Sequence, residues 1–265
     1  MGFFGEAFLL NALGAALLSG ALCAFLGVYV HLKRIIFIGI ALSEVAALGV
    51  AAGLYAGISP EAAASVLTVL VSLLFWWPGR EGFLSREAIL GLVYCVAAAL
   101  AILLLAANPM AEAHGVDLVS GNMLYTMADD IVLLCLVAGG IVALHLLLFP
   151  RFLFVSFDPE TARTMGLGER TVEFLIYLTL GLCIAVSMKT TGILFVFSSM
   201  VIPPMVGLVL CRRVWAVFVV AVGAAVAAGF LGLWVSFDWD LPTGPAIVCV
   251  EGMLFLAAVL VRVLR

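Results

Sequence analysis

Charged side chains are scarce in this chain. Asp, Glu, Lys and Arg make up 11% of its 265 residues, whereas 66% of the residues are hydrophobic. A water-soluble domain carries about 25% charged residues and roughly half apolar ones, so this sequence has too few polar side chains to cover a soluble surface. The small net charge of −4 and the lack of a basic run also exclude a nucleic acid as the ligand. The composition predicts a protein embedded in membrane lipid.

Sequence motifs of enzyme chemistry are missing as well. There is no HExxH zinc motif and no GxSxG nucleophile elbow, and the three histidines, His31, His114 and His145, lie on separate segments. No CxxC pair occurs, so the six cysteines are predicted to be small core residues. We therefore expect neither a catalytic residue nor a permanently bound cofactor. The chain also lacks a GxxxxGKS or GxxxxGKT phosphate loop, so a separate subunit must bind ATP if ATP drives its activity.

Long apolar runs fill most of the sequence instead. They are about 17 to 25 residues long, the length of a helix that crosses roughly 30 Å of hydrocarbon. We predict an all-α integral membrane protein, a polytopic bundle of about eight or nine transmembrane helices in a single domain over residues 1–265. The break between two spans near 188–192 is the weakest of the predicted boundaries, so a count of eight spans is the alternative. The shorter run 116–128 is predicted to be a partly inserted helix. The nine expected spans are 7–30, 35–57, 61–77, 87–107, 130–149, 171–188, 192–210, 214–236 and 245–262.

The distribution of basic residues predicts the orientation. Cytoplasmic loops carry an excess of Lys and Arg, and placing the 31–34 loop in the cytoplasm leaves Lys189 as the only one of the twelve Lys and Arg residues outside. We therefore expect an external N-terminus and a cytoplasmic C-terminus. The external loops then collect acidic residues, which favour arriving cations or basic patches on a delivery protein. These residues are Glu6, Glu61, Glu112, Asp117, Asp238 and Asp240.

Two glutamates lie within predicted spans, where hydrocarbon penalises an ionisable side chain by at least ~2.5 kcal/mol. Glu44 is surrounded by small residues, and Gly49 and Gly53 form a GxxxG pair that lets a helix pack closely on a neighbour. We expect Glu44 to face protein or a water-filled pathway; the alternative is a protonated Glu44 that donates to a backbone carbonyl. For Glu251, a structural hydrogen bond and a pathway lining remain equally open.

The longest predicted cytoplasmic loop runs from Arg151 to Arg170 and contains a helix start. Asp158 can act as the N-cap, Pro159 suits the first turn, and the acid of Glu160 favours the positive helix end. Gly166 or Gly168 could close this helix. Segment 157–170 is therefore a candidate docking helix for a cytoplasmic motor, with an ordinary surface loop as the alternative.

Four segments carry a family resemblance when taken in order. The first lies in the second predicted span and its preceding loop, at Lys33, Arg34, Ala41, Leu42, Ser43 and Gly49, and the second lies in the cytoplasmic loop, at Asp158, Glu160, Ala162 and Gly166. The third is MKTTGILFVFSSMVIPP at 188–204, and the fourth is LPTGPAIV at 241–248. The chain resembles the permease subunits of zinc, manganese and iron ABC importers, and the resemblance extends from residue 33 to residue 250.

The resemblance implies a permease that imports a divalent metal or a metal complex by alternating access across a bacterial inner membrane. The metal is then a transported substrate, and the partners are a second copy of the chain, a cytoplasmic ATP-binding subunit, an extracytoplasmic metal-binding protein and the surrounding lipid. Pathway residues are then expected at Glu44, Ser43 and Glu251. Residues that couple to the ATPase are expected at Asp158, Pro159, Glu160, Ala162 and Gly166.

One departure from the family pattern concerns the metal. The family's second-helix aspartate aligns with Ile40 and its histidine aligns with Glu44, so one ligand is lost and the other becomes a carboxylate. Hard oxygen ligands suit Mn²⁺ or Fe²⁺ better than imidazole-based sites, although zinc also accepts carboxylates. Two alternatives stay open: an organic-cofactor permease of the cobalamin or siderophore type, and a non-transporting membrane scaffold or sensor.

Overall fold

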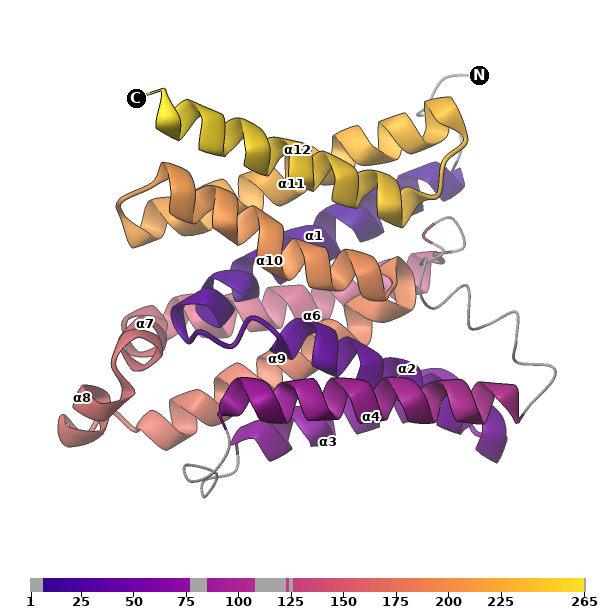
Figure 1. Cartoon of the computed structure of the whole chain (residues 1–265), viewed down its shortest axis with the longest axis horizontal. Helices are drawn as coiled ribbons and strands as arrows, with labels where there is room; N and C mark the ends of the chain where they lie inside the picture. Colours follow the sequence, from indigo (N-terminus) through magenta and orange to yellow (C-terminus); the bar gives the residue numbers. More distant parts are fainter. Residues whose placement is uncertain (1–6, 77–84, 108–122, 124–125, 265) are drawn as a thin grey trace. The chain divides into compact units, whose positions relative to one another are not determined.

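The computed structural model describes residues 7–76, 85–107, 123 and 126–264, and every regular element within these ranges is helical (Figure 1). Most of the helices are long and apolar. Their bounds are α1 Ala7–Leu32, α2 Ile38–Ala56, α3 Pro60–Trp76, α4 Arg86–Ala106, α6 Ala128–Leu147, α7 Phe149–Phe157, α8 Pro159–Thr164, α9 Glu169–Thr191, α10 Ile193–Leu210, α11 Val214–Trp239 and α12 Thr243–Val263.

The nine predicted spans are confirmed as helices, with every boundary within three residues of its expected position. Eight of them are long and apolar enough to cross a membrane, and α3, with 17 residues, is at the short end of the spanning range. The expected partly inserted helix at 116–128 lies, up to residue 125 and apart from Met123, outside the described residues.

The break between α9 and α10, which the sequence indicates least clearly, is produced by Gly192. This residue has φ +83° and ψ 169°, a conformation that glycine adopts without steric cost, and it separates Thr191 from Ile193. At the end of α9 the hydroxyls of Thr190 and Thr191 both donate to the carbonyl of Ser187. The N–H of Gly192 makes the last helical bond of α9, to the carbonyl of Met188, and the glycine then begins α10 as its N-cap. Two spans therefore form where the sequence allowed either one or two.

Segment 151–170 contains more helix than the sequence predicts. The structure has two short helices, α7 and α8, between α6 and α9 (Figure 1). In α7, Pro150 lies in the first turn, and Phe149, Phe152, Val155 and Ser156 are buried. Their spacing of three and four residues is that of one helix face, so α7 forms because this face can be covered.

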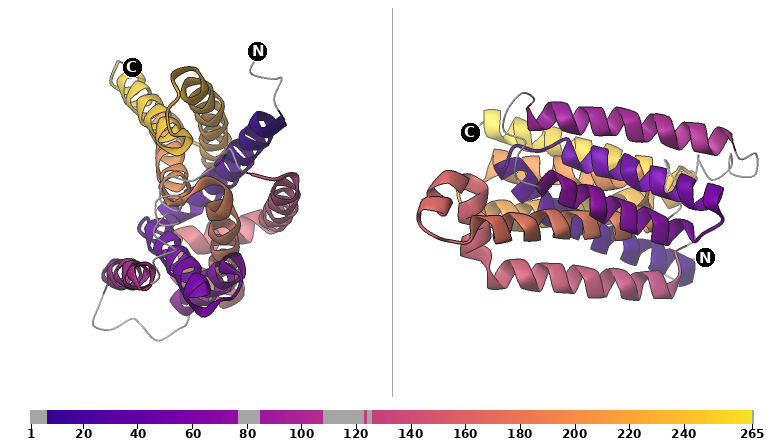
Figure 2. Two further views of the ribbon diagram at one scale, coloured as in Figure 1. Left: turned by 90° about the vertical axis from the view of Figure 1, so that its right-hand side faces the viewer. Right: turned by 90° about the horizontal axis from the view of Figure 1, so that it is seen from below.

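The chain divides into two compact units. The first comprises Met1–Val28, Ala113–Leu136 and Val186–Arg265. In it α10, α11 and α12 pack against one another, as two further views also show (Figure 2). Pro203 and Pro204 within α10 remove the usual donors for the carbonyls of Ser199 and Met200. The Met200 carbonyl lies against Gly27 of α1, where any side chain would overlap it.

The second unit comprises Tyr29–Glu112 and Val137–Ala185. Its α2 packs against both α3 and α4. Gly49 of α2 lies against the backbone of Ala64, and Gly53 lies against the backbone of Pro60, both in α3. The close packing predicted from the GxxxG pair is therefore confirmed, and it fixes α2 against α3. That residues 1–265 form one domain stays a prediction.

The α2–α3 contact can be tested with one pair of variants. At Gly49 an added methyl group would lie 2.4 Å from Ala64 Cα, whereas at Gly91 of α4 nothing lies within 4 Å. Overpacking costs about 1–3 kcal/mol, while Ala favours a helix by about 1 kcal/mol over Gly. Gly49→Ala should therefore lower the melting temperature of the purified protein in detergent. Gly91→Ala should leave it unchanged or raise it, and equal melting temperatures would contradict the tight contact.

Candidate functional site

Glu44 lies on a narrow stripe of α2 that the described chain leaves partly uncovered. Ile40, Glu44 and Leu48 are half-buried and recur every four residues, so they share one helix face. Exposed Phe37 and Tyr55 continue this stripe at its two ends. We call Phe37, Ile40, Glu44, Leu48 and Tyr55 the α2 stripe.

Buried alanines border the α2 stripe on its two sides, at Ala41 and Ala47, and buried Ala51 lies on the same face between Leu48 and Tyr55. Among the described residues none forms a hydrogen bond or an ion pair with Glu44. The predicted neighbour Ser43 is fully buried, and its hydroxyl donates to the carbonyl of Gly39 at 2.9 Å within the same helix. Of the two, Glu44 is the side chain that α2 presents outward.

Glu251 belongs to the first unit and is almost completely buried, with 1% of its surface exposed. Ser199 Oγ of α10 donates a hydrogen bond of 2.6 Å to its Oε1. Its Oε2 is buried and has no partner among the described residues. This contact joins α10 to α12, and of the two roles left open by the sequence it favours the structural hydrogen bond. Ser199 was not singled out in the sequence, because a serine in an apolar run carries no pattern that points to a partner.

The local structure predicted around Asp158 is confirmed. Its carboxylate accepts the backbone N–H of Thr161 at 3.0 Å and the Thr161 hydroxyl at 2.6 Å, and Pro159 is the first residue of α8. These bonds, that of the hydroxyl first, hold the pKa of Asp158 below its usual value. The cap is therefore present at neutral pH and is lost only as the pH falls through the lowered pKa.

The other end of α8 is closed by Gly166. It has φ +69°, its N–H donates to the carbonyl of Arg163, and the N–H of Leu167 donates to the carbonyl of Ala162. This pattern is a Schellman motif. Ala162 is fully buried beneath the helix, whereas Glu160 is exposed in its first turn. The five residues predicted to couple to an ATPase thus belong to one capped helix and its closing turn.

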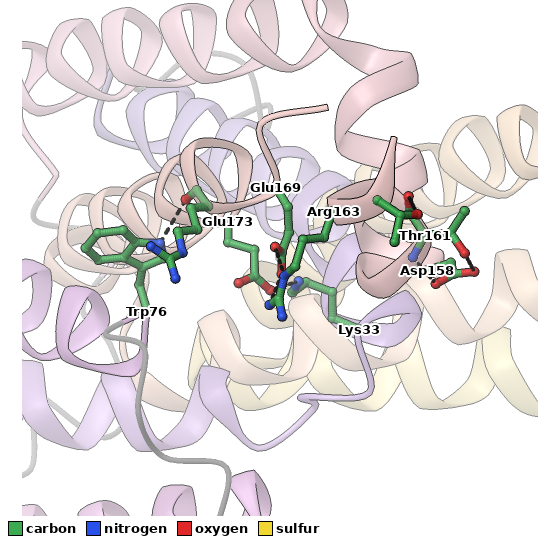
Figure 3. Close-up of polar contacts among 9 residues, drawn as sticks. Lys33, Trp76, Asp158, Thr161, Arg163, Glu169 and Glu173 are labelled. Atoms are coloured by element: carbon green, nitrogen blue, oxygen red, sulfur yellow. Dashed lines mark hydrogen bonds and ion pairs between the residues drawn. The ribbon is translucent and has the colours of Figure 1, made fainter. Parts of the chain in front are cut away.

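A set of charged contacts at the start of α9 was not predicted (Figure 3). Lys33 Nζ, in the turn between α1 and α2, lies 2.7 Å from Glu173 Oε1. Arg163 of α8 donates two bonds to Glu169, of 2.7 Å and 2.9 Å. Lys33 and Glu173 are 140 residues apart in the sequence, so no local pattern could have paired them.

No group of three or more His, Cys, Asp or Glu side chains that could hold a metal ion occurs within the part of the chain that the structure describes. The α2 stripe contributes one carboxylate, and Ile40, one turn earlier, contributes no donor atom. A metal contacting Glu44 would therefore need further ligands from water, from a carrier molecule or from another chain.

The model of a known protein family, the ABC 3 transport family, matches residues 6–262. The chain belongs to this family. Membership confirms the predicted resemblance to ABC permeases and, together with the helices long enough to span a bilayer, makes the chain a multi-pass membrane protein.

Several relatives of this ABC 3 family member carry names that refer to metals. The chain is 29% identical to a protein of Haemophilus influenzae named "Probable iron transport system membrane protein", over 97% of this chain and 91% of that one. It is 28% identical to "Manganese transport system membrane protein MntC" of Halalkalibacterium halodurans, over 95% and 86%. Among solved structures, "PsaBC from Streptococcus pneumoniae in complex with Fab" superposes with a TM-score of 0.85 at 21% identity, over 97% of this chain and 92% of that one. That likeness confirms the predicted all-α permease fold.

The capping of α8 yields a prediction for this family member. Asp158→Ala removes the acceptor of both Thr161 bonds, whereas Asp158→Asn keeps one oxygen acceptor for the backbone N–H. Backbone amides 161–163 should exchange hydrogen severalfold faster in Asp158→Ala than in wild type, with Asp158→Asn in between. Hydrogen exchange read by mass spectrometry measures this, and amides of α11 serve as an internal reference. Unchanged exchange in Asp158→Ala would show that tertiary packing, not the cap, holds α8.

Proposed function

We propose that the chain is the membrane permease subunit of an ATP-driven importer that moves a divalent transition metal (Mn, Fe or Zn) or a metal complex. The observation that carries this proposal is the position of Glu44, without a described partner, at the centre of the α2 stripe. The names of the iron and manganese relatives support the substrate class. The chain moves its substrate without chemical conversion, and ATP hydrolysis belongs to a separate subunit.

The position of Glu44 requires a polar environment. A carboxylate that faces lipid costs at least ~2.5 kcal/mol, so the α2 stripe faces a second copy of the chain and a hydrated pathway between them. Two Glu44 carboxylates near a two-fold axis would repel each other, and a divalent cation between them relieves that repulsion. A site with few ligands binds weakly, which suits transit because a tightly held ion leaves slowly.

The cytoplasmic partner is proposed to bind at α7 and α8. Phe157 and Met165 flank α8 and are both exposed, and α8 itself, Pro159–Thr164 with Asp158 as its N-cap, lies between them. Apolar side chains beside a short capped helix give the ATP-binding subunit a defined surface to contact.

The chain is proposed to lie in a bacterial inner membrane with its N-terminus external and its C-terminus cytoplasmic. An extracytoplasmic metal-binding protein then delivers the substrate to the acidic outer loops.

Cellular metal content tests the pathway. The chain is expressed with its ATP-binding subunit and its binding protein, as wild type, as Glu44→Gln and as Glu87→Gln. Glu87 is the control because it is an exposed glutamate in the first turn of α4 and does not belong to the acidic outer loops. We expect one metal to rise with wild type and with Glu87→Gln, and not with Glu44→Gln, as measured by mass spectrometry of whole cells.

The other results discriminate among the alternatives. A rise that survives Glu44→Gln would keep the transporter and make Glu44 structural. No change in any metal would contradict the free-ion substrate and favour an organic cofactor. If the chain also failed to bind an ATP-binding subunit, a non-transporting scaffold or sensor would explain it better.

Docking of the ATP-binding subunit is tested by a pair of methionine variants. Met165 follows α8, and Met127 precedes α6 on the side proposed to be external; both side chains are exposed. Met165→Glu places a charge in the proposed apolar contact and should reduce the amount of ATP-binding subunit that copurifies with the chain. Met127→Glu should not. Equal reduction, or none, would place the contact elsewhere.

A further inference from the structure

Four charged side chains of alternating sign form a row at the start of α9, within the second unit (Figure 3). Arg163 of α8 binds Glu169 of α9 through two hydrogen bonds. Glu169 is also within electrostatic range of Lys33, which forms the ion pair with Glu173 one helical turn further along α9. We call Arg163, Glu169, Lys33 and Glu173 the charge row.

The two ends of the charge row differ in exposure. The Arg163 side chain is largely in solvent, but its paired bonds to Glu169 have the two-point geometry that fixes a guanidinium against a carboxylate. The Lys33 and Glu173 side chains are only 4% and 13% exposed. An ion pair removed from water is held more strongly than a surface pair, and losing one partner leaves the other buried and uncompensated. The row therefore combines a buried ion pair at its Lys33 end with a two-point contact at the surface at its Arg163 end.

The inner end of the row joins the turn that leads into α2. The Lys33 N–H donates to the carbonyl of Tyr29, and the N–H of Ile35 donates to the carbonyl of Val30, so the turn is bonded back onto α1. Arg34 in this turn has φ +57°, a left-handed conformation that a non-glycine residue adopts only where its surroundings impose it. α2 then begins at Ile38, and Glu44 follows within two turns.

A second contact connects the same part of α9 to α3. Trp76 Nε1, in the last turn of α3, donates to the carbonyl of Arg170 at 2.9 Å (Figure 3). The centroid of the Trp76 ring lies 5.1 Å from that of the Phe174 ring, in an edge-on arrangement. Because α3 is fixed to α2 at Gly49, the start of α9 is joined to α2 by two routes.

We propose that the charge row transmits the movement of α8 to α2 and thereby to Glu44. Arg163 and Glu169 make α8 move with α9, and Glu173 and Lys33 make the base of α2 move with both. None of the four side chains contacts the substrate; they are positioning residues for the transport step. This inference rests on the proposed function, because it takes α8 as the docking helix and Glu44 as the pathway residue.

The experiment uses the chain reconstituted in proteoliposomes with its ATP-binding subunit and its binding protein, loaded with whichever metal the cellular test identifies. The readout is metal transported per ATP hydrolysed. The variants are Arg163→Gln, Lys33→Met and the charge exchange Lys33→Glu with Glu173→Lys. Arg212→Gln is the matched control. Arg212 is exposed and makes no ion pair among the described residues, so this substitution removes one positive charge, as Arg163→Gln does, without breaking an ion pair.

We expect Arg163→Gln and Lys33→Met to lower the metal transported per ATP by about tenfold, within the range found for residues that carry coupling. ATPase activity and retention of the ATP-binding subunit should persist, and the charge exchange should recover most of the ratio. A purely structural role would lower transport and ATPase activity together. It would leave the ratio unchanged, and that outcome would overturn the proposal.

A second measurement does not depend on transport. Hydrogen exchange in the first turn of α2 is compared with and without the ATP-binding subunit and a non-hydrolysable ATP analogue. We expect the subunit to change this exchange in wild type and in Arg212→Gln, and not in Arg163→Gln. The same response in Arg163→Gln would overturn the charge row alone. Wild-type protein that retains no ATP-binding subunit would overturn the proposed function, and the charge row with it.

Discussion

Hydrocarbon does not solvate a charge, and this constraint governs where the chain places its ionisable side chains. Glu173 is neutralised by Lys33, and Glu251 accepts a hydrogen bond from Ser199. Among these three glutamates of the helices, Glu44 is the one for which the described residues provide no partner. Two of these carboxyl groups thus join helices to each other, whereas that of Glu44 joins none among the described residues.

α2 is the helix on which these features converge. Gly49 and Gly53 hold one side of it against α3, and Lys33 anchors the turn at its base. A helix held in this way moves as a body, because tight backbone contacts leave little room for independent side-chain adjustment. A small displacement at the base of α2 therefore shifts Glu44 rather than being absorbed on the way.

The sequence predicts the helices well and their contacts poorly. Spans of this length and apolarity have few alternatives in a bilayer, so all nine were found, and the caps of α8 follow from the local chemistry of Asp158 and Gly166. The face that carries Glu44 follows from helical spacing, but whether a neighbour covers that face does not. Pairs such as Lys33 with Glu173 and Ser199 with Glu251 join residues 140 and 52 positions apart. Only the tertiary packing determines them.

The two caps of α8 have a consequence for assembly. A helix of six residues is ordinarily too short to persist by itself, because so few of its backbone groups bond within it. Here Asp158 satisfies donors at one end and the turn at Gly166 satisfies acceptors at the other. The partner proposed to dock on α8 would meet a helix that is already formed, so little conformational entropy would be lost on association and more of the contact energy would appear as affinity.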